Sequence, residues 1–458
     1  MKQVILYYPK LTGEEDSHPL YRGLPLSVLT LAAQLNPTKY HTFVIDGRID
    51  EPAAILRTID ASCVCVGISA ITSYQITDGI RFAQKIREID PSIPIIWGGW
   101  HPSLMPLETI HSTFADIVIT GQGEYTFTQL VDRLAEHRSP DDVPNLYYKN
   151  SDGSVCATGN VFLKDFASAR PVANAYPYVD MEQYIHPLWG NQRVIGFESS
   201  RGCPWSCKFC SIGSLYQKNW SALSAQQTFD GVSHLYRTYN IDAIHFYDNN
   251  FFTGEKRGQA LSQLLIQENI SLRWDGTAVV QQFVRFSDAY IESLKRSGFY
   301  RVIVGVESGD EDVLAKINKQ HSNAQVLQLV EMCQRHGIMA SLSFMVGFPW
   351  NPEKDFRETV RLIEKIKVID PHTEILLFIF SPYLGTPLYD VALKHGMKFP
   401  DSLEGWAGHT YERINTPWIS KGLLRKMNRY ISFFGTKDMS ENLTKFFRGD
   451  TGNDKLAP

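Results

Sequence analysis

Residues 201–210 read RGCPWSCKFC, and this stretch places three cysteines at CxxxCxxC spacing: Cys203, Cys207 and Cys210. Phe209 stands directly before the third cysteine. Three thiolates on one short loop can each bind one iron of a four-iron, four-sulfur cluster. The fourth iron then stays open for a small molecule, which distinguishes a reactive cluster from a fully ligated electron carrier. We therefore predict that the three cysteines are the metal ligands of a catalytic [4Fe-4S] centre.

Two other uses of these cysteines are weaker. A structural zinc site requires four ligands, usually two close-spaced pairs of Cys or His. No second pair lies nearby in the sequence, and His186 and His234 stand alone. A disulfide framework is disfavoured because seven cysteines in 458 residues are sparse and odd in number. The spacing therefore favours an iron–sulfur cluster in a reducing compartment.

The length and composition indicate an ordinary globular protein of two to four domains. The net charge of −4 does not point to nucleic acid or an anionic membrane as a partner. The apolar run at 1–8 is too short for a signal peptide, and no stretch approaches the roughly 18 apolar residues of a membrane span. We expect a cytoplasmic protein without a membrane span.

Residues 1–140 alternate short apolar runs with amphipathic stretches. Strands are predicted at 4–8, 42–45, 64–69, 94–97 and 116–119. Helices are predicted at 26–35, 52–59, 76–89, 105–112 and 124–135. Five strand–helix units in succession predict an α/β domain with a doubly wound parallel sheet of Rossmann-like type.

Ligands of such sheets bind beyond the carboxyl ends of the strands. Three loops there carry glycine or small polar residues, and glycine lets a bulky ligand approach the backbone closely. The candidate ligand-binding residues in these loops are Thr72, Ser73, Gly98, Gly99, His101, Gly121, Gly123 and Glu124. No GxGxxG follows the first strand, so a dinucleotide is disfavoured.

The rest of the chain divides into three parts. Residues 141–190 are rich in turn signals and are expected to be a linker with a small hairpin around 152–153. Residues 191–400 contain six further strand–helix units, which are too few for a closed eight-fold barrel and fit an open partial (β/α)6 barrel. Residues 401–458 are expected to form a small helical segment, with helices at 423–434 and 440–447.

The cysteine motif resembles that of the radical S-adenosylmethionine (radical SAM) enzymes, whose open iron chelates the amino and carboxylate groups of the cofactor. The loops at Gly98–Pro102 and Gly121–Phe127 resemble those of the cobalamin-binding domain fused to many of these enzymes. The motif that supplies a lower axial histidine in classical cobalamin proteins is absent. The resemblance therefore implies base-off cobalamin without that histidine, with His101 as an alternative axial ligand.

Three downstream motifs complete the resemblance. Residues 248–251, 305–309 and 347–349 resemble the second-, fourth- and fifth-strand motifs of the family, which lie near the methionyl, ribose and adenine parts of S-adenosylmethionine. The residues expected to bind this cofactor are Phe209, Asp248, Asn249, Glu307, Ser308 and Gly347. Lys316 and Lys319 are expected to be solvated charges at a helix end.

The resemblance implies an enzyme that uses both cofactors, most simply to methylate an unactivated carbon of a small-molecule, lipid or natural-product substrate. It also implies an external electron donor such as flavodoxin or ferredoxin. Two alternatives stay open at this point. In the first, the radical serves a rearrangement, cyclisation or coupling without methyl transfer. In the second, the chain is a non-catalytic cobalamin or iron–sulfur sensor.

Overall fold

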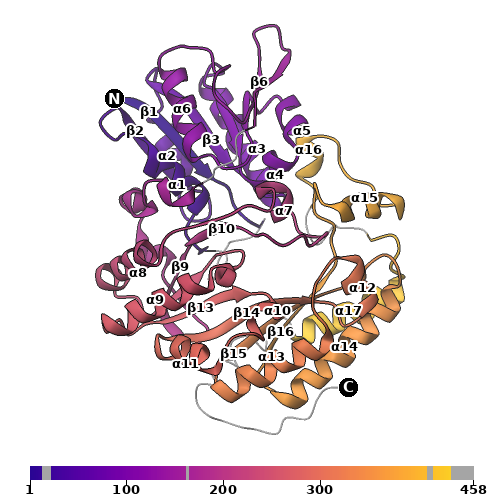
Figure 1. Cartoon of the computed structure of the whole chain (residues 1–458). Coiled ribbons are helices and arrows are strands. Elements are labelled where there is room, and N and C mark those ends of the chain that lie inside the picture. Colours follow the sequence, from indigo (N-terminus) through magenta and orange to yellow (C-terminus); the bar gives the residue numbers. More distant parts are fainter. Residues whose placement is uncertain (13–21, 161–164, 410–415, 435–458) are drawn as a thin grey trace.

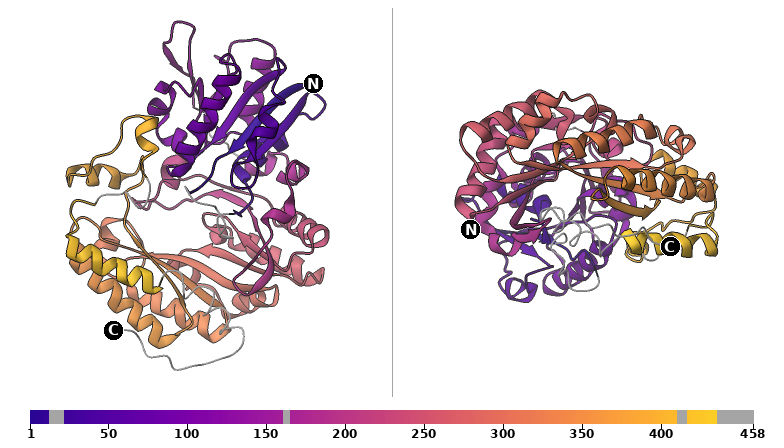
Figure 2. Two further views of the ribbon diagram at one scale, coloured as in Figure 1. Left: turned by 180° about the vertical axis from the view of Figure 1, so that it is seen from behind. Right: turned by 90° about the horizontal axis from the view of Figure 1, so that it is seen from below.

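The computed structural model describes residues 1–12, 22–160, 165–409 and 416–434. Two α/β domains lie one above the other, the first indigo to purple and the second magenta to orange in Figure 1. The yellow C-terminal segment runs along one side of both domains (Figure 2). The helix predicted at 440–447 lies outside the described residues. No helix within the described residues is long and apolar enough to span a membrane.

The first sheet has the strand order β2-β1-β3-β4-β5-β6-β7. Its strands are β1 (Lys2–Tyr8), β2 (Tyr40–Asp46), β3 (Cys63–Ser69), β4 (Ile95–Gly98), β5 (Ile117–Ile119), β6 (Leu146–Lys149) and β7 (Val155–Ala157). The first five are parallel, and each overlaps a predicted strand. The order 2-1-3-4-5 is that of a doubly wound sheet, so the predicted fold of this domain is confirmed.

Helices cover both faces of the first sheet. The helices α1 (Leu26–Gln34) and α6 (Glu124–Ala135) pack on one face. The other face carries α2 (Pro52–Leu56), α3 (Tyr74–Ile89) and α5 (Pro106–His111). In α3 the buried residues Ile76, Ile80, Ala83 and Ile86 recur at helical spacing, and apolar residues at that spacing hold such a helix on a sheet.

The hairpin of β6 and β7 extends the first sheet beyond the predicted boundary at residue 140. Strand β6 pairs antiparallel with β5, and β7 pairs with β6. The turn contains Gly153 at φ +81°, a conformation that favours glycine. The connector between the domains is therefore shorter than the predicted linker. It contains the 3₁₀ helices η2 (Phe166–Ser168), η3 (Val172–Tyr178) and η4 (Met181–Tyr184).

The second sheet curls into a partial barrel with the order β16-β15-β14-β13-β12-β9-β8. Its strands are β8 (His186–Leu188), β9 (Asn191–Phe197), β12 (Ala243–Phe246), β13 (Arg273–Ala278), β14 (Phe299–Glu307), β15 (Met339–Val346) and β16 (Glu374–Ile379). All but β8 are parallel, which confirms the predicted six-unit barrel. The outer helices are α8 (Ala225–Tyr239), α9 (Glu255–Gln267), α11 (Asp288–Arg296), α13 (Asn323–His336) and α14 (Pro352–Ile369).

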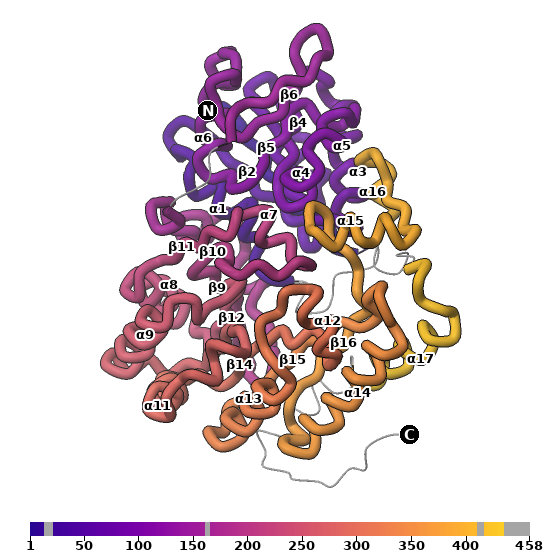
Figure 3. Tube along the Cα trace, turned by 45° about the vertical axis from the view of Figure 1, so that its right-hand side comes forward, coloured from indigo at the N-terminus to yellow at the C-terminus, as the bar shows by residue number. Residues whose placement is uncertain are grey.

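The C-terminal segment contacts both domains (Figure 3). It follows α15 (Pro387–Lys394) and contains α16 (Leu403–Trp406), which packs against α3 and α5 of the first domain. The last described helix, α17 (Lys421–Phe434), packs along the edge strand β16. The apolar residues of this segment thus close the side of the molecule and join its two domains.

Candidate functional site

The cysteine loop lies between β10 (Ser200–Gly202) and α7 (Ile212–Tyr216), above the carboxyl end of β9. All three thiols are free and half-buried. Burial raises the pKa of Cys210 to about 11, and it also raises the pKa values of Cys203 and Cys207. No group of three Cys, His, Asp or Glu side chains in the described parts of the chain converges on one metal ion.

Asp248 and Asn249 fasten the strand that leads into the cysteine loop. The Asp248 carboxylate accepts hydrogen bonds from the Ser199 backbone N–H (2.7 Å), the Ser199 hydroxyl (2.7 Å) and the Ser200 hydroxyl (2.5 Å). The Asn249 side-chain carbonyl accepts a bond from the Gly202 N–H at 3.0 Å. Both side chains are thus engaged within the protein, and the cofactor contact that the motif suggested for them stays a prediction.

Gly202 shows why this fastening needs a special backbone. Its φ is +81°, and an added Cβ would lie 2.0 Å from the Asn219 carbonyl oxygen.

Asn250, the residue after Asn249, is 1% exposed, and neither its amide oxygen nor its amide nitrogen has a hydrogen-bond partner in the protein. A buried amide left unpaired is costly. Asn250 is therefore better suited to contact a bound molecule than either of the two residues before it.

Glu307 and Lys319 form a buried ion pair near the cysteine loop. The Lys319 Nζ lies 3.0 Å from Glu307 Oε1 and 5.7 Å from the centre of the Phe209 ring. Lys319 is not the solvated helix-end charge that the sequence predicted, because only 9% of its side chain is exposed. An added Cβ on Gly305 would lie 2.1 Å from Glu307 Oε1, so the carboxylate lies directly over this glycine. The Lys319 charge opposes the effect of burial on the pKa of the Cys207 thiol.

Asp355, at the start of α14, ties together the ends of β14 and β15. It accepts hydrogen bonds from the Ser308 hydroxyl (2.6 Å) and from the N–H groups of Gly347 (2.8 Å) and Phe348 (3.3 Å). Burial raises the pKa of Asp355 to about 6. The Ser308 hydroxyl is therefore engaged by the protein, and Gly347, at φ +88°, presents its carbonyl to the Trp418 indole N–H at 2.8 Å. Sequence reasoning missed Asp355, although it follows the Gly-Phe-Pro motif closely.

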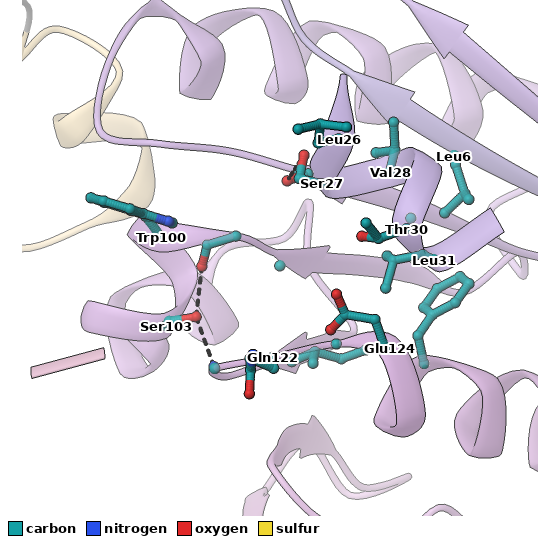
Figure 4. A pocket seen from close by; sticks show the side chains of 18 of the residues that line it. Leu6, Leu26, Ser27, Val28, Thr30, Leu31, Trp100, Ser103, Gln122 and Glu124 are labelled. Atoms are coloured by element: carbon teal, nitrogen blue, oxygen red, sulfur yellow. Dashed lines mark hydrogen bonds between the residues drawn. The ribbon is translucent and has the colours of Figure 1, made fainter. Parts of the chain in front are cut away.

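A cavity of about 180 Å³ opens at the carboxyl ends of β1, β3, β4 and β5 (Figure 4). Five of the predicted ligand-binding residues line it: Gly98, Gly99, Gly121, Gly123 and Glu124. The Ser103 hydroxyl fixes two of these loops, because it donates to the Gly99 carbonyl (2.6 Å) and accepts from the Gly121 N–H (2.9 Å). A Cβ added to Gly121 would meet open space, and one added to Gly98 would lie 3.8 Å from the Ile119 carbonyl oxygen, so these two positions leave room for a ligand.

The other three predicted residues lie outside the lining of this cavity. Ser73 caps α3, and its hydroxyl accepts a hydrogen bond from the Gln75 N–H. Thr72 Oγ1 lies 2.9 Å from His101 Nδ1, and the His101 ring packs edge-on against Trp406 with centroids 5.6 Å apart. Burial lowers the pKa of His101 to about 3. His101 therefore lies against Trp406 of the C-terminal segment and outside the cavity lining, and its role as an axial ligand stays a prediction.

The second domain supplies one wall of the cavity. Glu198 and Arg201, before the cysteine loop, and Leu215 and Tyr216, after it, line the cavity together with the loops of the first domain. Arg201 pairs with Glu124 across the domain boundary and with Glu198, three residues before it, between β9 and β10. Residues that flank the cysteine loop thus form part of the first-domain cavity.

Comparisons with known proteins agree with this geometry. Residues 197–363 match the family model of the radical SAM superfamily, and residues 18–131 match that of the B12 binding domain. The chain is a B12-binding radical SAM enzyme. Its family therefore brings a [4Fe-4S] cluster, S-adenosylmethionine and cobalamin as cofactors.

Several relatives of this B12-binding radical SAM enzyme span most of its length. The uncharacterized methyltransferase PH0819 of Pyrococcus horikoshii is 27% identical over 90% of this chain and 88% of its own. An anaerobic magnesium-protoporphyrin IX monomethyl ester cyclase of Synechocystis is 21% identical over 80% of this chain and 72% of its own. The structure of the radical SAM methyltransferase TsrM from Kitasatospora setae, with cobalamin and a [4Fe-4S] cluster bound, superposes with a TM-score of 0.67 at 16% identity. It covers 83% of this chain and 72% of that one, and shows the same fold.

Proposed function

We propose that the enzyme is a cobalamin-dependent radical SAM methyltransferase that methylates an unactivated carbon of a small-molecule, lipid or natural-product substrate. The observation that carries this proposal is the shared wall between the first-domain cavity and the residues that flank the cysteine loop. A methyl donor in the cavity would lie beside the radical-generating centre. The name of PH0819 agrees with methyl transfer.

The residues fit the cofactors that the family brings. Cys203, Cys207 and Cys210 would hold the cluster, which with S-adenosylmethionine supplies a 5′-deoxyadenosyl radical, while methylcobalamin supplies the methyl group. The Glu307 carboxylate would accept hydrogen bonds from ribose hydroxyls, and Lys319 balances its charge. Glu307 and Lys319 would together orient the bound S-adenosylmethionine and keep water from it.

The cavity would take the part of cobalamin that enters the first domain. Its lining includes the apolar side chains of Leu6, Ile96 and Phe127 and the polar side chains of Glu124 and Ser103. An apolar pocket with a few placed polar groups is the usual form of a cofactor site. Because His101 does not line it, we propose that no histidine of this loop binds cobalt.

Cyclisation is a second candidate, because the Synechocystis cyclase matches most of this chain. Methylation adds one methyl group to the substrate, whereas cyclisation adds none. The mass of the product therefore separates the two reactions. In either case the enzyme requires a substrate and an electron donor.

We propose that the donor is a flavodoxin or ferredoxin and that the enzyme works in the cytoplasm. All seven cysteines are free thiols, as is usual in a reducing compartment. Reduced flavodoxin that fails to support cleavage of S-adenosylmethionine, where a chemical reductant succeeds, would contradict the choice of donor.

The test is anaerobic reconstitution of the full chain with iron, sulfide and hydroxocobalamin, followed by metal analysis and an absorption spectrum. We expect a four-iron cluster and stoichiometric cobalt. Cys207→Ala should lose the cluster and the formation of 5′-deoxyadenosine but keep cobalt. Cys156→Ala, which removes a half-buried free thiol of the β6–β7 hairpin, is the matched control and should keep both. Deoxyadenosine formed by Cys207→Ala would contradict the cluster assignment, and absence of cobalt from the wild type would contradict methyl transfer.

A further inference from the structure

A buried ion-pair triad joins the two domains beside the cysteine loop. Arg201 Nη1 donates to Glu124 Oε1 of the first domain. Arg201 Nε and Nη2 donate to Glu198 Oε2 of the second, at 2.9 and 2.8 Å. The guanidinium also stacks over the Phe166 ring of the connector, 4.6 Å from its centre. One cation thus contacts both domains and the segment between them.

The triad has two carboxylates and one guanidinium in a largely buried place. The exposed fractions of the side chains are 3% for Glu124, 10% for Arg201 and 21% for Glu198. Two carboxylates share one guanidinium, so one negative charge is not balanced within the triad. Burying charges is costly, and the gain in stability from a buried ion pair is often small. A role beyond stability is therefore a reasonable expectation for this triad.

The position of the triad connects it to both cofactor sites. Arg201 stands two residues before Cys203, and Glu124 begins α6 at the end of the Gly121–Gly123 loop. All three triad residues line the first-domain cavity. Glu124 and Glu198 also line a second cavity of about 480 Å³ between α1, η3 and α8. A molecule in the first-domain cavity would therefore lie against the side chains that hold the entrance to the cysteine loop.

Glu124 has an unused acceptor in this position. Its Oε1 receives Arg201, but its Oε2 is buried and has no hydrogen-bond partner in the protein. Figure 4 shows the Glu124 carboxylate pointing from the start of α6 into the cavity, toward Thr30 and Leu31 of α1. A buried carboxylate oxygen without a donor costs free energy that a ligand N–H or O–H would recover. The cavity is thus suited to a ligand that carries amide or hydroxyl donors.

We propose that the Glu124–Arg201–Glu198 triad is a positioning device that couples occupancy of the first-domain cavity to the cysteine loop. Glu124 Oε2 accepts a hydrogen bond from an amide or hydroxyl group of the bound cobalamin, while Oε1 holds Arg201 and so fixes the backbone that leads to Cys203. This inference rests on the proposed function, because it requires cobalamin in this cavity. Coupling between two sites is reciprocal, so an assembled cluster must raise the affinity for cobalamin by the factor with which cobalamin stabilises the cluster.

The experiment measures hydroxocobalamin binding by equilibrium dialysis, with anaerobic full-length chain in cluster-free and cluster-loaded forms. For the wild type we expect the loaded form to bind more tightly, by roughly 5- to 150-fold, the usual range for coupled sites. Glu124→Gln keeps the size of the side chain but removes its charge and its pairing with Arg201, so the ratio of affinities should fall toward one. Glu182→Gln is the matched control, because it makes the same change in the surface pair with Arg193 and should leave the ratio unchanged.

Each outcome has one meaning. A Glu124→Gln protein that keeps the wild-type ratio overturns the proposal, and so does one that loses affinity equally in both forms, since a purely structural role would do that. Arg201→Lys, which keeps the charge but not the two-sided contact, provides a second variant if Glu124→Gln does not fold, and its ratio should also fall. A wild type that binds no cobalamin in either form would contradict the proposed function itself. A wild type that binds equally in both forms would contradict only the coupling.

Discussion

Arg201 and Arg301 are both buried between two carboxylates and stacked on an aromatic ring, yet their surroundings differ. Arg301 lies inside the barrel sheet, 3.0 Å from Asp275 of β13 and 2.8 Å from Glu374 of β16. Its guanidinium lies 4.2 Å from the centre of the Trp189 ring. Arg201 instead spans two domains and borders a cavity.

The difference shows how similar chemistry can serve two purposes. The partners of Arg301 belong to one rigid sheet, and His245 extends the network by a 2.7 Å hydrogen bond to Asp275. Loss of the Arg301 guanidinium would leave the carboxylates of Asp275 and Glu374 buried without their cation. The partners of Arg201 line a cavity that a ligand can enter. If the Arg201 guanidinium is removed, water in this cavity can partly solvate the carboxylates of Glu124 and Glu198. We therefore expect the Arg301 network to determine stability and the Arg201 triad to determine cofactor binding.

The largest expected effect is the loss of stability on removal of Arg301. Arg301→Ala should lower the free energy of unfolding by about 3–5 kcal/mol, because Asp275 and Glu374 would stay buried without their cation. Urea unfolding of the metal-free chain, followed by circular dichroism, measures this loss. Arg201→Ala is the comparison variant and should lose less. Equal losses in the two variants would remove the distinction between the networks.

The next effect is the pH dependence of stability that arises from His101, a buried residue outside the cavity lining. Burial lowers the pKa of His101 from its usual 6.5 to about 3, so below pH 6.5 the unfolded chain binds a proton that the folded chain refuses. Stability from this residue is complete above pH 6.5 and is lost by about 1.4 kcal/mol per pH unit as the pH falls toward 3. His101→Gln should flatten this dependence, as measured by urea unfolding between pH 7 and 4. An unchanged pH dependence would show that His101 is already protonated in the fold.

Much of the site could be predicted because its motifs are local. The spacing of Cys203, Cys207 and Cys210 is a property of one loop, and the glycines of the first domain mark the loops that follow its strands. Five of the eight residues predicted for the first-domain site line one cavity. Periodicity also predicted both sheets, since apolar strands and amphipathic helices alternate along the chain.

Contacts between distant residues could not be predicted in this way. Arg201 and Glu124 are 77 positions apart, and no local pattern indicates that they meet. The burial of Lys319 depends on its packing beside Glu307 and Phe209, which a helix-end position does not reveal. Asp248 is a residue type that can contact a ligand, but the sequence did not predict that its carboxylate accepts hydrogen bonds from the hydroxyls of Ser199 and Ser200. Sequence motifs located the site, whereas the pairing of charges within it required the tertiary structure.

A smaller effect tests whether the triad acts as a unit. Glu124→Gln and Arg201→Met, made singly and together, form a double-mutant cycle across the domain boundary. Because the two side chains share a contact, we expect a coupling energy of about 0.5–3 kcal/mol in the free energy of unfolding. Urea unfolding of the metal-free chain provides the four values. Additive losses would mean that the pair contributes nothing of its own, and the contrast with Arg301 would then rest on cofactor binding alone.

The smallest effect is expected at the surface pair of Glu182 and Arg193, which provides the baseline for both networks. Their side chains are 58% and 35% exposed, and the nearest N–O distance is 2.7 Å. Glu182→Gln should change the free energy of unfolding by about 0.2–1 kcal/mol, because water solvates both groups when they separate. Added salt should reduce even this difference, since it screens exposed charges. The same Glu→Gln change therefore has little effect where water readily solvates the separated groups, and a larger one at Glu124, whose side chain is 3% exposed. A loss at Glu182 as large as that at Glu124 would show that burial is not what separates the two pairs.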